Sequence, residues 1–507
     1  MLLFNQVAFA QQLITLPKAI QLAQQNSLQA AVNKNTLEIS NQTFRLQRAQ
    51  LFPQVSLNAN LPGYNSSITS VTQPDGSIRF ATVEQAFSNV GISLSQKIAA
   101  TGGTFTASSN INRFDRLSGN RSTNFNTQPF ILGLNQPLFR FNETAFGIKK
   151  AQLNQLIGSK QFIKQQAQLA LDVCKQYHLL LQSQQQLKLL VLALENTAAL
   201  LNAAKQKWQL GKMGEEEYLQ IQLEQLSTQT QWQQEKAKYA LLKNAFCNLL
   251  AMPIHAELVL AESLPSQWKK YALSVSLIDS LLKQYQANNP AYAQQKLKQL
   301  QVEADLKRAK MGSLPSLNLI AGYGSNQSAP VLNDAYQSLL TQQNATVGLS
   351  MPLFSSGANA ANLKIASYQL QNLQYQLQLF EQGIVNDLTQ QVQQYNLALE
   401  QIVQAQMADS LAQRRYSISY NKYQVGKITY TDLLLAQNQK LQAKQGYLQA
   451  ISAYWQAFYQ LRVSTLFDLE KGERIQSPES RIQKLDGFFL VLAFVIGRLF
   501  LEARSET

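Results

Sequence analysis

Acidic and aromatic side chains are grouped around two glycines of this 507-residue sequence. Glu217 lies six residues after Gly211. Asp432 lies six residues after Gly426, which Tyr423 shortly precedes. Carboxylates that are brought close together repel one another and attract cations. The alternative is that both acids are solvated residues near a helix N-terminus, where the helix dipole stabilises negative charge.

The two glycines interrupt long helical patterns. Glycine costs about 1 kcal/mol inside a helix relative to alanine, so each glycine is predicted to mark a turn between two helices. The predicted hairpins cover 143–250, with a tip near 211, and 359–466, with a tip near 426. In the second hairpin, apolar residues follow the heptad spacing of a coiled-coil seam: Tyr447, Ile451, Tyr454, Phe458 and Leu461.

The hairpins belong to an internal duplication. GLNQPLF begins at Gly133 and GLSMPLF at Gly348, and both this pair and the two turn glycines differ by 215 residues. Upstream, LFPQVSLNA and SLPSLNLIA match at an offset of 262 residues, which places Pro53 opposite Pro315. The first copy therefore holds 47 extra residues, the difference between the two offsets. Each copy reads as a helix, a strand region and a long helical hairpin.

Apolar and small polar residues alternate in the strand regions. Val55, Leu57 and Ala59 alternate with Ser56 and Asn58. In a soluble sheet this pattern means one face on a core, whereas in a membrane barrel it means apolar residues toward lipid and polar residues toward the lumen. The polar segments 64–86 and 325–344 are predicted as loops, and the 47 extra residues as one more hairpin.

Cysteine and histidine are scarce, with two of each. Cys174 and Cys247 lie symmetrically about Gly211, so a hairpin places them at one height, as a candidate disulfide or as two small buried residues. His178 follows Cys174 by one helical turn, but a single rung of a hairpin rarely provides metal geometry. No metal site, no cofactor and no enzymatic activity are predicted, because no nucleophile–base pair or phosphate loop is present.

The net charge of +14 comes from Lys and Arg scattered along the predicted helices, a pattern that does not favour nucleic-acid binding. No uninterrupted apolar stretch reaches the roughly 18 residues of a transmembrane helix, so strands would have to cross any membrane. Ala8-Phe9-Ala10 follows a short apolar run and is typical of a signal-peptide cleavage site.

These patterns predict a mainly α-helical chain with a β-sheet region. It divides into a truncated signal peptide (1–10), repeat 1 (11–250, strands near 51–63, 87–98, 103–113 and 128–139), an equatorial linker (251–275), repeat 2 (276–469, strands near 315–324 and 345–354) and a C-terminal tail (470–507).

From Ile14 to Leu469 this duplicated layout resembles the TolC-like outer-membrane factor family. The resemblance implies a homotrimer with one shared outer-membrane β-barrel and a periplasmic α-helical coiled-coil tunnel. It implies an exit channel in the outer membrane of a Gram-negative bacterium, serving an efflux pump or type I secretion system through a periplasmic adaptor and an inner-membrane transporter of RND, ABC or MFS type. The alternative is a periplasmic coiled-coil scaffold. The substrate, the transporter class and the number of barrel strands per protomer, four or six, stay open.

The resemblance also implies roles for the residues near the glycines. Asp432 matches a constriction acid, and Tyr423 and Glu217 match a tyrosine and an acid that link neighbouring hairpins. Ile428 and Leu435 depart from the family pattern, which has an arginine link and a second acid there. The positions that match the family's adaptor-contacting tips are Leu210, Gly211, Lys212, Val425, Gly426 and Lys427.

Overall fold

A computed structural model describes residues 12–119, 121–254, 258–261, 273, 277–468 and 473–475. The predicted signal peptide, His255 and nearly all of the predicted tail lie outside these residues. The chain divides into two units, and each is described by itself. The first unit holds 1–37, 159–292 and 381–507, and the second holds 38–158 and 293–380.

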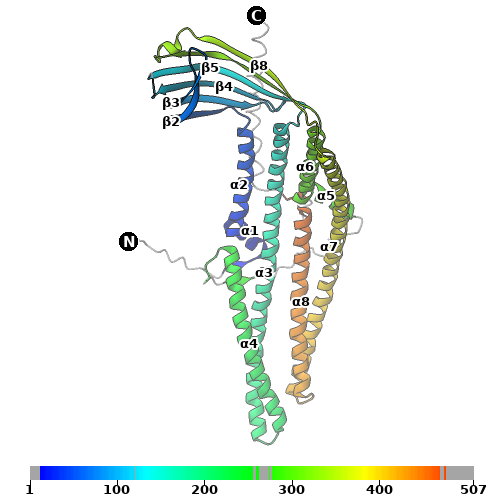
Figure 1. Cartoon of the computed structure of the whole chain (residues 1–507). Helices are drawn as coiled ribbons and strands as arrows, with labels where there is room; N and C mark the ends of the chain where they lie inside the picture. The colour runs from blue at the N-terminus through cyan, green and yellow to red at the C-terminus, as the bar shows by residue number, and fades with distance from the viewer. Residues whose placement is uncertain are drawn as a thin grey trace, which may run out of the picture. The chain divides into compact units, whose positions relative to one another are not determined.

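Two helical hairpins dominate the first unit (Figure 1). The first consists of α3 (Glu143–Gln209) and α4 (Glu215–Leu250), and the second of α7 (Ala358–Gln424) and α8 (Tyr430–Thr465). The long arms both have 67 residues and the short arms both have 36. Every one of these helix ends is shifted by 215 residues between the hairpins, so the predicted duplication is confirmed in the backbone.

The core of the second hairpin follows the predicted seam. All five residues of the heptad pattern are buried, from 8% exposure at Tyr447 to none at Leu461. Tyr395 of α7 packs against Tyr454 of α8, with 5.6 Å between ring centroids. The aromatic residues therefore hold helix to helix, as their spacing predicts.

Short helices and strands make up the rest of this unit. They are α1 (Leu16–Asn26), the start of α2 (Leu28–Ala49), α5 (Ile278–Asn288), and two small sheets that pair β1 (Gln12–Ile14) with β6 (Leu258–Leu260) and β9 (Phe467–Asp468) with β10 (Glu473–Arg474). The buried Tyr177 side chain of α3 connects this helix to β1 and to the residue after β6 through two hydrogen bonds. Its hydroxyl lies 2.9 Å from the carbonyl oxygen of Ile14 and 2.6 Å from that of Ala261.

One described helix, α3, is long and apolar enough to cross a membrane by length and composition alone. The sequence predicted no such helix, because no uninterrupted apolar stretch reaches about 18 residues. Only 22% of the apolar stretch is buried in the chain. Helices of soluble coiled coils can share these properties, so this one feature does not define a membrane span.

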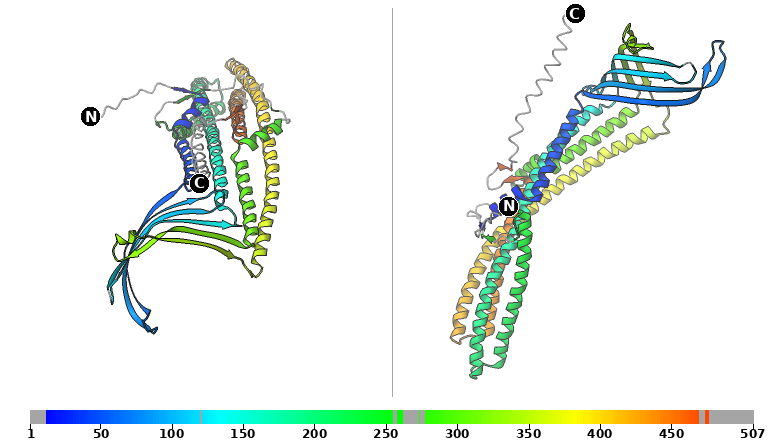
Figure 2. Two further views of the ribbon diagram at one scale, coloured as in Figure 1. Left: turned by 90° about the horizontal axis from the view of Figure 1, so that it is seen from above. Right: turned by 90° about the vertical axis from the view of Figure 1, so that its left-hand side faces the viewer.

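The second unit contains one antiparallel sheet of six strands in the order β2-β3-β4-β5-β7-β8 (Figure 2). The strands are β2 (Gln54–Thr72), β3 (Ile78–Lys97), β4 (Thr104–Arg116), β5 (Ser122–Leu138), β7 (Ser316–Ala329) and β8 (Leu340–Ser350). A 3₁₀ turn, Asp334–Tyr336, and α6 (Pro290–Gly312) complete the unit together with parts of α2, α3 and α7. The extra hairpin of the first repeat thus lies within the sheet.

The predicted loop at 64–86 is wrong over most of its length. The strands β2 and β3 continue through it, and the turn is confined to residues 73–77, where Gly76 has a φ of +84°. The ladder of backbone hydrogen bonds needs no apolar side chains, so a polar composition concealed a hairpin. The hairpin continues past β4, whose pairing with β3 stops at Gln85 (Figure 2).

The register gives the sheet one apolar face and one polar face. Cross-strand partners share a face, and Val55 pairs with Leu94, Leu94 with Ala107, and Ala107 with Leu132. The opposite face carries serine, asparagine and glycine, as in the pair of Ser56 with Ser93. The alternation predicted from the sequence is therefore carried across all six strands.

Candidate functional site

Both hairpin tips end in the same backbone motif. Gly211 has a φ of +67° and Gly426 a φ of +71°. The amide of each glycine donates to the carbonyl three residues earlier, at 2.9 Å, and the following lysine amide donates to the carbonyl five residues earlier. This is the Schellman ending, which places glycine in the left-handed region at low cost. No atom lies within 4 Å of a Cβ built on either glycine, so both turns are open to solvent.

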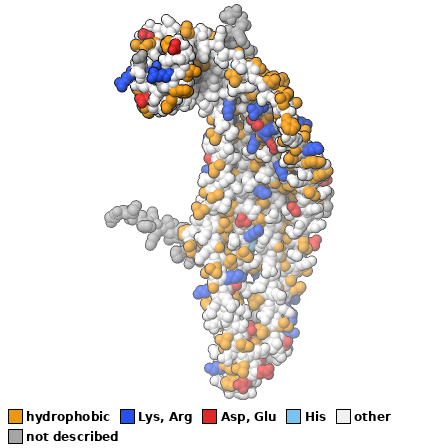
Figure 3. Space-filling view, viewed as in Figure 1, with side chains coloured by type: hydrophobic (Ala, Val, Ile, Leu, Met, Phe, Trp, Pro, Cys, Tyr) orange, Lys and Arg blue, Asp and Glu red, His pale blue; other side chains and the backbone are white. Residues whose placement is uncertain are grey.

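The residues that flank the glycines are exposed. Leu210 has 69% of its surface accessible and Val425 has 68%. Lys212 and Lys427 are exposed as well. Figure 3 shows acidic and hydrophobic side chains together at the end of the α3–α4 hairpin, where apolar side chains without cover are available for contact with another protein.

Asp432 forms a capping box at the start of α8. The Thr429 amide and hydroxyl donate to its carboxylate at 3.1 and 2.7 Å, and the Asp432 amide donates to the Thr429 hydroxyl at 3.2 Å. These hydrogen bonds hold the pKa of Asp432 below its usual range, so the carboxylate is charged at neutral pH. The alternative role predicted for this acid, at a helix N-terminus, is therefore realised in the chain.

Glu217 is the equivalent residue of the first tip, but it does not cap its helix. The N-cap position of α4 is Gly214, which has no side chain to exchange hydrogen bonds. Three acids follow in the first turn, Glu215, Glu216 and Glu217, where the helix dipole favours negative charge. The first tip is therefore acidic but lacks a side-chain cap.

The two tips meet through a buried tyrosine. Tyr430, at the first position of α8, is 2% exposed and packs with Ala204 of α3 and Ile221 of α4. We call these three residues and the partly buried apolar residues around them the tip cluster; the latter are Leu200, Leu201, Met213, Tyr218, Tyr423 and Leu434. Beside it, the Gln220 side chain donates to the Thr431 hydroxyl at 3.4 Å.

The structure brings Tyr423 and Glu217 together within one chain. Burial raises the pKa of Tyr423, and the negative charge of Glu217 raises it further. Burial likewise raises the pKa of Tyr430, with the charge of Glu224 as the next cause. Both phenols are therefore protonated at neutral pH and can donate hydrogen bonds to acids.

At the two departures from the family pattern, Ile428 is half-buried and Leu435 is 50% exposed. Neither side chain can form an ion pair, so contacts at these positions are apolar. Sequence reasoning missed Thr429, Tyr430 and Glu224. The pattern Thr-x-x-Asp from Thr429 to Asp432 is a readable capping-box signal, whereas the burial of Tyr430 depends on a second hairpin that is distant in sequence.

The cysteines lie on the first hairpin, far from its tip in sequence. Both are buried and free, so the candidate disulfide is not formed in the structure. The Cys174 sulfur lies 3.6 Å from Nδ1 of His178, which lies 2.8 Å from the Cys174 carbonyl oxygen. Burial lowers the pKa of His178 and raises that of both thiols. Among the described residues, no three His, Cys, Asp or Glu side chains are grouped as a metal site.

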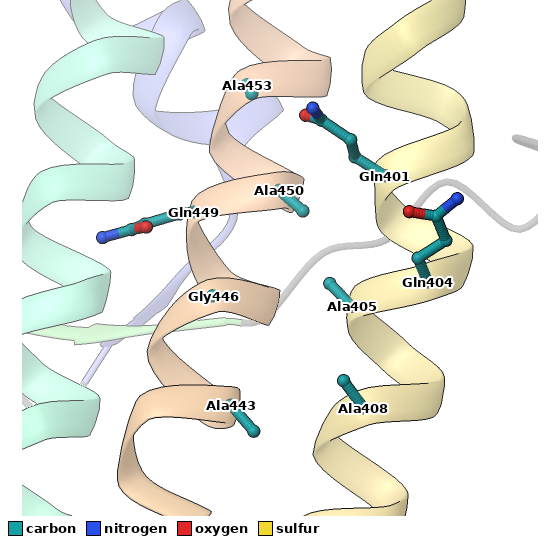
Figure 4. Close-up of a pocket in the computed structure, with 9 residues that line it drawn as sticks. All are labelled: Gln401, Gln404, Ala405, Ala408, Ala443, Gly446, Gln449, Ala450 and Ala453. Carbon is teal, nitrogen blue, oxygen red and sulfur yellow. The ribbon is translucent and has the colours of Figure 1, made fainter. Parts of the chain in front are cut away.

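An open groove of about 500 Å³ runs between α7 and α8 (Figure 4). Small residues form its floor on both helices, among them Ala405, Ala408, Gly446 and Ala450. The side chains of Gln401 and Gln404 extend from α7 beside it. Small residues allow another helix to approach closely, but nothing in the groove is charged or arranged for catalysis.

Aromatic residues bracket the apolar face of the sheet in the second unit. Toward the β2–β3 turn, the aliphatic rows end on Tyr64, Phe130 and Tyr323, which are 64%, 45% and 52% exposed. Beyond the opposite ends lie Phe139 and Phe354, at 71% and 87%. An apolar band between two aromatic girdles is the arrangement of a membrane-facing sheet.

The sequence is similar to that of known efflux proteins. Residues 281–465 match the profile of the family described as outer membrane efflux protein. Outer membrane protein TolC of Salmonella enteritidis is 26% identical over 182 residues, which are 35% of this chain and 37% of TolC. The match thus spans little more than a third of the length of this relative.

The fold is similar to that of solved outer-membrane channels over most of the chain. The Campylobacter jejuni CmeC outer membrane channel has a TM-score of 0.67 at 15% identity, with 94% of this chain and 90% of that one covered. The open state of the Neisseria gonorrhoeae MtrE outer membrane channel has a TM-score of 0.63 at 16% identity, with 91% of each covered. Residues 281–465 are therefore similar in sequence to the outer membrane efflux protein family, and the fold of the chain is that of these outer-membrane channels.

Proposed function

We propose that the protein is the outer-membrane exit channel of a tripartite efflux pump or a type I secretion system. Three copies form one channel, with the sheets in the outer membrane of a Gram-negative bacterium and the helical hairpins in the periplasm. Transport through it is passive, and the energy comes from an inner-membrane transporter that a periplasmic adaptor connects to the tips.

The observation that carries this proposal is the two-faced sheet with two open edges. Its apolar face lies between aromatic residues, and its polar face carries serine, asparagine and glycine. Within the described part of the chain, no strand pairs with the outer edge of β2 or of β8. A sheet of six strands cannot close alone, since about eight is the practical minimum for a barrel. Several copies are therefore needed to leave no edge in lipid.

The exposed tips support an adaptor-binding role. Leu210, Lys212, Val425 and Lys427 are exposed, and the glycines between them have open space on their Cβ side. An adaptor that binds a spread arrangement of tips better than a closed one would shift the channel toward its open state.

We assign the constriction to Asp432. The carboxylate is fully charged at neutral pH and is held in one orientation by the capping box. Three such carboxylates near the axis of a trimer would attract divalent cations. Tyr423 and Glu217 act beside it by linking the two hairpins of one chain.

Reconstitution into planar lipid bilayers tests the channel. We expect discrete single-channel currents from the purified protein, and release from outer membranes by detergent only. The alternative, a periplasmic coiled-coil scaffold, predicts release by a salt wash and no current, and that result would overturn the proposal.

Two matched variants test the constriction. Asp432→Asn removes the charge but keeps a side-chain oxygen that can accept from Thr429, whereas Thr429→Ala weakens the cap and keeps the charge. We expect Asp432→Asn to raise conductance and weaken the block by divalent cations, and Thr429→Ala to retain the block. Equal block in both variants and in the wild type would refute the assignment.

A further inference from the structure

The strands of the sheet differ in how they connect to helices. Four of them are adjacent to a helix in the chain: β2 follows α2, β5 precedes α3, β7 follows α6, and β8 precedes α7. The strands β3 and β4 connect only to other strands. These two strands coincide with the 47 residues by which the first repeat exceeds the second. They therefore add two strands to the sheet without adding a helix to the chain.

The inserted strands are part of the sheet on both sides. The strand β3 pairs with β2 from Gln54↔Ser95 to Thr72↔Ile78, and β4 pairs with β5 from Thr104↔Asn135 to Arg116↔Ser122. A hairpin that lay outside the wall would leave β2 and β5 to pair with each other. Their separation by two full strands shows that the insertion lies between the repeats' shared strands.

The lower turn of the insertion is also anchored. The side-chain amide of Asn142 donates to the carbonyls of Ala99 and Ala100 at 2.9 and 3.1 Å. The Thr101 hydroxyl donates to the Gln136 side chain at 2.7 Å, and the Gln136 amide donates back to the Thr101 carbonyl at 3.1 Å. These contacts hold the turn against the junction of β5 and α3, where no helix of its own supports it.

The faces of the inserted strands match those of their neighbours. On β3, Ile92 lies on the apolar face and Ser93 on the polar face. On β4, Ala107 lies on the apolar face and Ser108 on the polar face, because they pair with Leu94 and Ser93. The insertion is thus suited to the same boundary between lipid and water as the other four strands.

The two edges of the sheet are complementary. The strand β8 is exposed along its whole length, and most of β2 is exposed as well. Because all six strands alternate in direction, β2 and β8 run antiparallel to each other. The β8 edge of one copy can therefore pair with the β2 edge of another copy in the antiparallel manner of the whole sheet. An edge of this length requires such a partner in lipid.

We propose that the assembled protein has an outer barrel of eighteen strands, six from each of three copies. The inference rests on the proposed trimeric channel. At a strand spacing of about 4.8 Å and a tilt of about 40°, eighteen strands enclose a diameter of about 36 Å between backbones, and twelve enclose about 24 Å. The outer mouth would then admit larger solutes than a twelve-stranded mouth does.

A deletion tests the width. Removal of residues 78–122 deletes β3 and β4 and joins the turn at 73–77 directly to β5. The residues on either side of that turn are then Thr72 and Thr123. Both lie on the same face of the sheet, so the register of the faces is kept. Size-graded poly(ethylene glycols) are added to the outer side of reconstituted channels. We expect the exclusion diameter of the outer mouth to fall by about one third, since barrel diameter grows roughly linearly with strand number. An unchanged exclusion diameter would overturn the proposal.

A second set of variants tests the wall without a deletion. Ser93→Cys and Ser108→Cys are compared with Ile92→Cys and Ala107→Cys in the reconstituted full chain. A charged, membrane-impermeant thiol reagent should modify the first pair and change the current, and should not reach the second pair, which faces lipid. The native Cys174 and Cys247 have no exposed surface and contribute little background. Equal modification of all four positions would show that the insertion lies in water and overturn the proposal.

Different results would overturn the proposed function and the inference of an eighteen-stranded barrel. If the wild-type protein inserts into no bilayer and conducts no current, the proposed function fails. If it conducts, but electron microscopy of the trimer counts twelve strands in the wall, only the inference of a wide outer barrel fails.

Discussion

The two hairpin tips have the same backbone and different side chains. Both end in a Schellman turn at a glycine, after arms of equal length. The second tip starts its return helix with the Thr429–Asp432 capping box and a buried Tyr430, whereas the first tip starts with Gly214 and three glutamates. Duplication therefore kept the length and the turn of the hairpin, while capping and burial diverged.

Residues at equivalent positions of the two tips therefore differ in charge and burial. Glu215 is the counterpart of Tyr430, and Glu217 is the counterpart of Asp432, each at a distance of 215 residues. Glu215 is exposed at the first tip, whereas Tyr430 is buried in the tip cluster at the second. The first tip contributes Met213 and Tyr218 to the same cluster, and Tyr218 also stacks on Trp208 with 5.1 Å between ring centroids.

The largest expected effect comes from the pair Tyr430→Ala and Glu215→Ala. Loss of a buried aromatic side chain costs about 3–5 kcal/mol of stability, whereas loss of an exposed glutamate changes stability by about 0.5 kcal/mol or less. Denaturant unfolding in detergent measures both. Similar values for the two variants would contradict the view that Tyr430 supports the tip cluster and Glu215 does not.

The turn glycines should respond alike. Gly211→Ala and Gly426→Ala place a side chain in the left-handed region, which costs about 1–2 kcal/mol. No atom lies within 4 Å of the new methyl group in either case, so only backbone strain contributes. Protease sensitivity of each tip, together with unfolding, reports the effect. A clearly larger loss at one tip would mean that the two turns are not equivalent.

Substitutions at the two N-cap positions should change stability in opposite directions. Thr429→Ala removes the N-cap of α8 and costs about 1 kcal/mol. Gly214→Thr places a threonine three residues before Glu217, which completes a capping box at the first tip and stabilises it by up to about 1 kcal/mol. The backbone at Gly214 is extended, with φ −68° and ψ 149°, and has space for the side chain. Amide hydrogen exchange in the first turns of α4 and α8 measures both changes; faster exchange in Gly214→Thr would disprove the capping argument.

The smallest expected effect is a pH dependence of stability that only the first hairpin has. Burial lowers the pKa of His178, whose counterpart in the second hairpin is Gln393. Above about pH 6.5 both folded and unfolded states are neutral there, and below it only the unfolded state gains the proton, so stability falls as pH falls. The expected loss between pH 7 and pH 6 is less than about 1 kcal/mol. His178→Gln should remove this loss from the pH dependence of thermal unfolding, and an unchanged profile would exclude it.

Much of the architecture could be predicted because it depends on local patterns. A constant offset located both hairpins, since a gapless duplication preserves helix length, and alternation located all six strands, since strand side chains alternate between faces. The segment 64–86 was missed because its polar composition concealed a hairpin whose backbone ladder needs no apolar side chains.

The sequence by itself determined where the helices turn, which residues form the α8 seam and which strand residues are apolar. Tertiary structure alone decided that the inserted strands lie between β2 and β5 and that Tyr430 is buried between two hairpins. The physical reason is range. Turn and seam formation depend on neighbours within a few residues, whereas strand order and the tip cluster join segments separated by tens to hundreds of residues in the chain.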